Sequence, residues 1–176
     1  AVCEDAARAV RSGASLVVLS DREVDAAHAP IPMMLAVGAV HHYLIDAGIR
    51  MRASIIAITG EARDSHDLAC LVGVGASAVN PYLAIDQVRA LAVDGIVQID
   101  PVVAQENYRS ALQNGLLKIM SKMGICTVSA YRGSELFEAI GLDLWVVLGL
   151  ALVSLAFLLR GGVQPMYVYY SVAYGA

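Results

Sequence analysis

Charged side chains are scarce in this sequence of 176 residues. Asp, Glu, Lys and Arg together make up 16% of it, against about 25% in an average soluble domain. The 12 basic residues are also outnumbered by 16 acidic ones, so the formal net charge is −4. Because phosphate-binding surfaces need a basic excess, we expect no nucleic acid among the partners. With 58% hydrophobic residues, intrinsic disorder is excluded as well.

Cysteine is also scarce. Cys3, Cys70 and Cys126 lie more than fifty residues apart. No close pair indicates a zinc or redox motif, and an odd count argues against a disulfide framework. The first residues mix charged and apolar side chains, unlike a signal peptide. We expect a reduced, cytoplasmic setting and no metal site, and we take a sequence that begins without a Met to be a piece of a longer chain.

The common motifs of nucleotide and acyl-transfer enzymes are missing. Gly73 and Gly75 follow a predicted helix, whereas the glycines of a dinucleotide fingerprint follow a strand. There is no phosphate-loop signature and no Gly-x-Ser-x-Gly elbow. Residue spacing alone therefore does not establish an enzyme.

The first half of the chain alternates between strand and helix patterns. Short apolar runs rich in β-branched residues predict buried strands at 15–19, 53–58 and 76–79. Helices are predicted between and after them, at 33–47, 62–72 and 82–93. This order indicates an α/β fold of parallel βαβ units.

Polar clusters follow each predicted strand, at 20–22, 59–61 and 80–81. Ligands bind at the carboxyl ends of parallel strands, but most strands also end in ordinary polar turns, and both interpretations stay open. Glu61 and His66 form either an acid–base pair or a hydrogen-bonded helix start with Arg63. The adjacent His41 and His42 are interpreted as packed or surface side chains, because neighbours on a helix point in different directions.

The second half is predicted to begin after a turn-rich stretch at 94–106. A helix is expected at 107–118, a short strand within 118–127 and another helix at 134–140. Lys122 beside a glycine suits a phosphate or a reduced flavin, and Arg132 suits a carboxylate. Solvated surface charge is the competing explanation for both.

The last 33 residues carry Arg160 as their one charged side chain. Residues 144–159 are an uncharged run of about 24 Å as a helix, shorter than the roughly 30 Å of a membrane core. We expect a hydrophobic C-terminal helix. A membrane anchor, a buried helix and a non-native sequence from a frameshift or joining error are the three explanations, and we favour the last.

Three long strings carry a family resemblance. They are APIPMMLAVGAVHHYLIDAGIRMRASI (29–55), TGEARDSHDLACLVGVGASAVNPYLA (59–84), and NGLLKIMSKMGICT with YRGSELFEAIGL (114–127 and 131–142). They resemble the large subunit of glutamate synthase, at the end of its central domain and the start of its flavin domain. The resemblance implies central-domain scaffold at 1–104, the first elements of a (β/α)₈ flavin-binding barrel at 105–142, and an unmatched tail at 143–176.

The resemblance also implies functional residues. Met120, Ser121, Met123 and Gly124 match the family pattern where FMN packs, Lys122 in the same motif is the catalytic candidate, and Arg132 is the substrate-binding candidate. The complete family enzyme uses FMN and an iron–sulfur cluster, most of whose ligands are absent from this chain. We therefore expect the isolated chain to be inactive.

The resemblance implies a role in ammonia assimilation and glutamate biosynthesis. The family enzyme makes L-glutamate from L-glutamine and 2-oxoglutarate by ammonia channelling and FMN-dependent reductive amination. Its partners are the remainder of the large subunit and either an NADPH-dependent small subunit or ferredoxin. The alternative is a non-catalytic α/β scaffold or interaction protein, associated with a membrane through the 144–159 run.

Overall fold

A computed structural model describes residues 1–24, 29–134, 136 and 137 of the chain. The elements follow in the order α1 (Val2–Arg11), β1 (Leu16–Ser20), α2 (Met33–Asp46), the 3₁₀ helix η1 (Arg50–Arg52), β2 (Ser54–Ile58), α3 (Ser65–Gly73), β3 (Ala78–Asn80), α4 (Tyr82–Val93), α5 (Pro101–Lys122) and α6 (Val128–Tyr131). The three predicted strands and the helices between them are therefore present, with ends shifted by a few residues.

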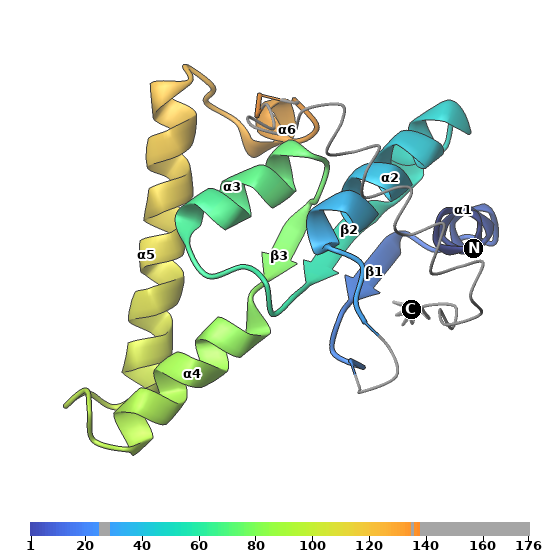
Figure 1. Cartoon of the computed structure of the whole chain (residues 1–176). Helices are drawn as coiled ribbons and strands as arrows, with labels where there is room; N and C mark the ends of the chain where they lie inside the picture. The colour runs from blue at the N-terminus through green and yellow to red at the C-terminus, as the bar shows by residue number, and fades with distance from the viewer. Residues whose placement is uncertain (25–28, 135, 138–176) are drawn as a thin grey trace, which may run out of the picture.

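The three strands form one parallel sheet in the order β1-β2-β3. Val18 of β1 lies opposite Ile56 of β2, which in turn lies opposite Ala78 of β3. Right-handed crossovers between successive neighbours place their helices on the same face of a sheet, and Figure 1 shows α2 and α3 lying together in front of the strands. The α/β fold with parallel βαβ units is confirmed.

The main core lies between this sheet and helices α1 and α2. Burial alternates along β1 and β2, so that Leu19 and Ile55 are fully buried while their neighbours are half-exposed. Val37, Val40 and Leu44 recur at helical spacing and supply the apolar face of α2. The buried residues of the two strands and the apolar face of α2 therefore pack against one another in a single layer.

A second, smaller core joins α3, α5 and α6. Its buried members are Ala69, Val72, Met120 and Tyr131. Helix α5 lies beside α3 and α4 at the β3 side of the molecule, and α6 lies near the C-terminal end of α3 (Figure 1). This core fixes the place of the segment that follows the sheet.

The strand expected within 118–127 is wrong. Helix α5 runs to Lys122, and residues 123–127 form a turn and an irregular segment. Asp100 starts the helix by accepting hydrogen bonds from the amides of Val102 and Val103, with Pro101 at the first position. The turn-rich stretch therefore ends at residue 100, and one helix crosses the domain boundary predicted after residue 104.

Some predictions fall outside the described part of the chain. These are most of the helix expected at 134–140 and the hydrophobic helix expected in the tail. Among residues 1–24, 29–134, 136 and 137, no helix is long and apolar enough to cross a membrane.

Candidate functional site

Two of the predicted polar clusters meet at the carboxyl ends of β1 and β2. Asp21, only 9% exposed, accepts hydrogen bonds from the hydroxyl of Thr59 at 2.6 Å and from the amide of Gly60 at 3.0 Å. Thr59 is itself completely buried and its oxygen accepts from the amide of Glu61 at 3.1 Å. These charge-assisted hydrogen bonds to the nearly buried Asp21 carboxylate hold the loops after β1 and β2 in one geometry.

The third cluster lies at the same edge, because the amide of Thr59 donates a hydrogen bond of 3.0 Å to the carbonyl of Asn80. Arg22 lies over the ring of Tyr82, 4.5 Å from its centroid, at a separation that gives a cation–π attraction. Burial and the nearby Asp21 raise the pKa of the Tyr82 hydroxyl. The structure thus brings together the three polar segments predicted from the sequence, and their bonds to one another position the loops.

A cavity of about 330 Å³ opens beside this edge, between the loop before α2 and the start of α3. Glu61 and His66 both line it, but the Glu61 carboxylate accepts a hydrogen bond from the amide of Met33 at 2.9 Å. His66 lies 3.6 Å from the thiol of Cys70. Burial and two nearby aspartates raise the pKa of that thiol, so Cys70 stays protonated at neutral pH and is a poor nucleophile.

The start of α3 has the hydrogen-bonded form that was the alternative to an acid–base pair. Asp64 accepts from the amides of His66 and Asp67, and the Asp67 carboxylate reaches back to the amide of Asp64. The amide of Arg63 also donates to Asp67, at 2.9 Å. This reciprocal capping satisfies amides that would otherwise lack partners at the helix start.

His41 is a packed side chain, only 8% exposed, as one of the two interpretations of this pair expected. Its Nδ1 accepts a hydrogen bond of 2.8 Å from Nε of Arg50, which is also 8% exposed. The other two nitrogens of Arg50 donate to the carbonyls of Ala53 and Gly75, at 2.6 and 2.9 Å. Sequence reasoning missed Arg50, and its one visible signal is a charge just before a buried strand.

The residues matched to the family's flavin motif lie at the C-terminal end of α5. Met120 is 2% exposed and packs in the second core, whereas Ser121 and Lys122 are exposed. Ser121 and Gly124, which has φ of +73°, line an open cavity of about 380 Å³. A hydroxyl, a glycine turn and apolar side chains suit one edge of a flavin ring.

This segment is not at the carboxyl edge of the sheet. In Figure 1 the strand arrows point toward the end of the molecule that holds the start of α4, while the C-terminal end of α5 lies near α6 at the other end. Arg132, which follows α6, donates from Nη1 to the hydroxyl of Ser77 at 3.0 Å, just before β3. The structure therefore places the flavin-motif residues and Arg132 away from the Asp21 edge.

The curated proteins that are similar to this chain include glutamate synthases. Ferredoxin-dependent glutamate synthase 1 of Arabidopsis thaliana is 48% identical over 158 residues, which cover 83% of this chain and 10% of that protein. The large chain of the NADPH glutamate synthase of Bacillus subtilis is 44% identical over 138 residues, 78% of this chain and 9% of that protein. The chain thus spans about a tenth of the length of these relatives.

Solved structures show what the fold resembles. A flavocytochrome b2 variant matches 97% of this chain and 40% of its own, with a TM-score of 0.58 at 16% identity. A mandelate oxidase variant matches 74% of this chain and 37% of its own, with a TM-score of 0.54 at 22% identity. The sheet and its helices are therefore similar to part of the fold of these flavin enzymes.

The match to a family model identifies the family of this chain. The model described as the glutamate synthase central domain matches residues 1–143. It thus covers the sheet, both cores and the flavin-motif segment, and it runs across the boundary predicted at 104, which stays a prediction. An alignment with the ferredoxin-dependent enzyme of Spinacia oleracea, 41% identical and covering 94% of this chain and 10% of that protein, extends beyond residue 143, so the origin of the tail also stays a prediction. The chain belongs to the glutamate synthase central domain family.

Proposed function

We propose that this chain is part of a glutamate synthase large subunit, which makes L-glutamate from L-glutamine and 2-oxoglutarate in the cytoplasm. The match of the central-domain model to residues 1–143 carries the proposal. Relatives include ferredoxin-, NADPH- and NADH-dependent glutamate synthases. The electron donor is accordingly ferredoxin or a nicotinamide nucleotide, the latter through a small subunit.

In this proposal the chain is a scaffold that presents the turn after α5 to FMN. Met120 anchors the turn, because its side chain is buried against Ala69 and Tyr131. The hydroxyl of Ser121, the side chain of Met123 and the backbone of Gly124 would hold the cofactor, which would supply the hydride for reductive amination. The exposed ammonium of Lys122 supplies positive charge beside it.

Arg132 is the substrate-binding candidate of the same proposal. Its Nη1 is bonded to Ser77, which leaves the rest of the guanidinium free to bind a carboxylate. The iron–sulfur cluster and most of its ligands belong to the remainder of the large subunit. Among the described residues, no group of three or more His, Cys, Asp or Glu side chains is arranged to hold a metal ion.

The test uses the full-length protein that carries this chain. We expect it to copurify with flavin, visible in the absorbance spectrum, and to form glutamate from glutamine and 2-oxoglutarate with a reduced donor. K122M is expected to lower that rate about tenfold or more. Its matched control is K118M, an exposed lysine one turn earlier on α5, which should stay within about twofold of the unchanged protein. A full-length protein without flavin and without glutamine-dependent glutamate formation would contradict the proposal.

A further inference from the structure

A cavity of about 440 Å³ lies at the amino ends of β1 and β2, next to η1. Three arginines line it, Arg50, Arg52 and Arg132. Two serines, Ser15 and Ser54, complete its polar lining, and there is no Asp or Glu among the described residues that line it. We refer to it as the arginine pocket. Its side chains offer up to five N–H donors per guanidinium and two hydroxyls.

Arg50 is the fixed member of the arginine pocket. It is more than nine-tenths buried, and Nε, Nη1 and Nη2 each donate one hydrogen bond, to His41, Ala53 and Gly75. Three of its five N–H groups are thereby used. These bonds hold the guanidinium plane in place, so the two remaining donors have defined directions.

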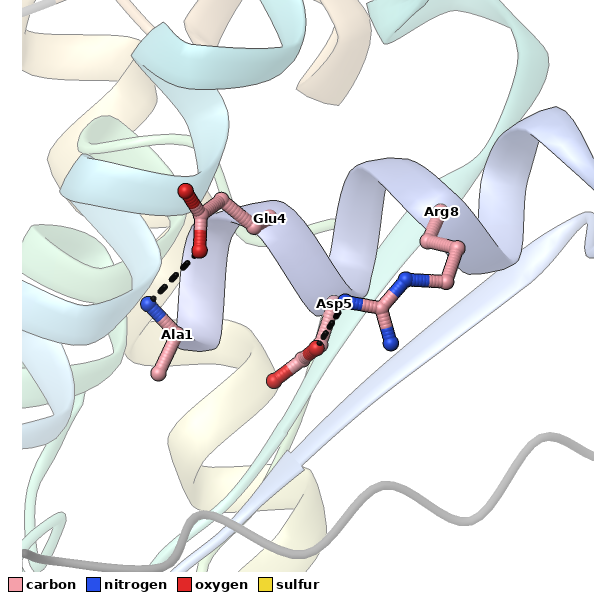
Figure 2. Close-up of polar contacts among 4 residues, drawn as sticks. All are labelled: Ala1, Glu4, Asp5 and Arg8. Atoms are coloured by element: carbon pink, nitrogen blue, oxygen red, sulfur yellow. Dashed lines mark ion pairs between the residues drawn. The ribbon is translucent and has the colours of Figure 1, made fainter.

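The positive charge of the arginine pocket is not balanced by any carboxylate in the described part of the chain. The two ion pairs found there both lie on α1 (Figure 2), between the amino group of Ala1 and Glu4 and between Asp5 and Arg8. Burial, and then the positive charge of Arg132, lower the pKa of Arg50. Two cations held close together in a partly buried place are destabilising unless an anion joins them.

We propose that the arginine pocket binds a small oxyanion, a carboxylate or a phosphate group. Guanidinium groups bind both through paired N–H···O bonds, and such charge-assisted bonds are stronger than neutral ones. The cavity is large enough for a small dicarboxylate or inorganic phosphate. The site lies at the amino ends of the strands, whereas Asp21 lies at their carboxyl ends. It shares Arg132 with the function proposed above, but Arg50 and Arg52 belong to this cavity alone, so the R52Q variant separates the two proposals.

Calorimetric titration of the full-length protein tests the proposal. Inorganic phosphate and succinate are titrated separately at low ionic strength into the unchanged protein and into R52Q, R132Q and R89Q. Arg52 is exposed, so R52Q is expected to fold normally, which circular dichroism checks. Arg89 is an exposed arginine on α4 outside the pocket and serves as the matched control.

We expect at least one of the two anions to bind, and its dissociation constant to rise about tenfold or more in R52Q and in R132Q. R89Q should change it less than twofold, and added KCl should weaken binding. Binding of phosphate alone or of succinate alone identifies which oxyanion chemistry the site prefers. Binding of neither anion, or binding by R52Q as tight as by the unchanged protein, overturns the proposal. A loss of thermal stability in R132Q without anion binding also overturns it, because a carboxylate of the protein itself would then fill the pocket.

Discussion

Asp21 connects two loops that are 39 residues apart in the sequence. Its carboxylate is nearly buried and receives one hydroxyl and one amide hydrogen bond from the loop after β2. Both donors would lose their partner if the carboxylate were removed, and a buried donor without a partner is costly. The Asp21 side chain therefore fixes the position of the loop after β2 relative to the loop after β1.

Replacement of Asp21 tests this connection. D21N keeps the size of the side chain but loses the charge and one acceptor oxygen, so we expect the free energy of unfolding to fall by about 1–3 kcal/mol. Urea denaturation followed by circular dichroism measures it. D94N, at an exposed aspartate after α4, should change the free energy by less than about 0.5 kcal/mol. Equal losses in both variants would contradict the role assigned to Asp21.

Gly75 is required by its contact with His41. Its φ is +125°, and a Cβ atom there would lie 2.4 Å from the imidazole ring, while its carbonyl also accepts a hydrogen bond from Arg50. G75A is expected to lose about 3 kcal/mol or more, from backbone strain added to overpacking. The control is G13A, since Gly13 has φ of +106° with nothing within 4 Å of an added Cβ. It should lose only the strain, about 1–2 kcal/mol, in the same urea measurement.

The residues at this scale differ in how well they could be predicted. Asp21 and Thr59 follow apolar strand runs, and the ends of parallel strands meet at one edge, so their grouping was foreseeable from the sequence. Arg50 was not, because its partners His41 and Gly75 come from separate elements. No local pattern indicates which of several arginines will be buried.

Helix α5 shows why an element was predicted wrongly. Its last turns contain Ile119 and Met120, which resemble the apolar run of a short strand, but Leu116 and Met120 are four residues apart and both belong to the second core. That core is formed with α3, which ends 28 residues before α5 begins, and with α6, which begins 6 residues after α5 ends. Tertiary packing and the Asp100 cap extended the helix through a stretch whose local pattern was ambiguous.

The crossing of α3 and α5 explains a glycine inside a helix. A Cβ atom on Gly115 would lie 2.4 Å from the Cβ of Ser65, at the start of α3. Glycine in a helix interior normally costs about 1 kcal/mol relative to alanine. Here it permits the two helices to approach closely, so packing outweighs helix propensity.

Two alanine substitutions separate packing from propensity. G115A is expected to lower the free energy of unfolding by about 1–3 kcal/mol, because the overlap with Ser65 exceeds the propensity gain. G38A in α2 is the matched control, since nothing lies within 4 Å of an added Cβ there, and it should raise the free energy by about 0.5–1 kcal/mol. Thermal denaturation of both variants gives the signs. A stabilised G115A would show that the helices do not cross closely.

At the scale of the whole molecule, two cores divide the chain. The first joins the sheet to α1 and α2, and the second joins α3, α5 and α6. The parallel sheet was predictable because three apolar runs alternate with helical segments. The second core was not, because Tyr131 is in a four-residue helix that carries no periodic signal of its own.

Tyr131 packs in the second core through its aromatic ring. Its hydroxyl has no hydrogen-bond partner among the described residues. Its ring is completely buried, and burial raises the pKa of the hydroxyl, which therefore stays protonated at neutral pH.

Removing a buried group that has no partner is expected to cost little. Y131F should accordingly stay within about 1 kcal/mol of the unchanged protein, whereas Y131A should lose about 3–5 kcal/mol by leaving a cavity between α3 and α5. Urea denaturation of both variants measures the difference, and the slope of the transition shows whether the second core unfolds together with the first. A loss above about 2 kcal/mol in Y131F would show that the hydroxyl is bonded, and the ring would then not be the only stabilising part of this side chain.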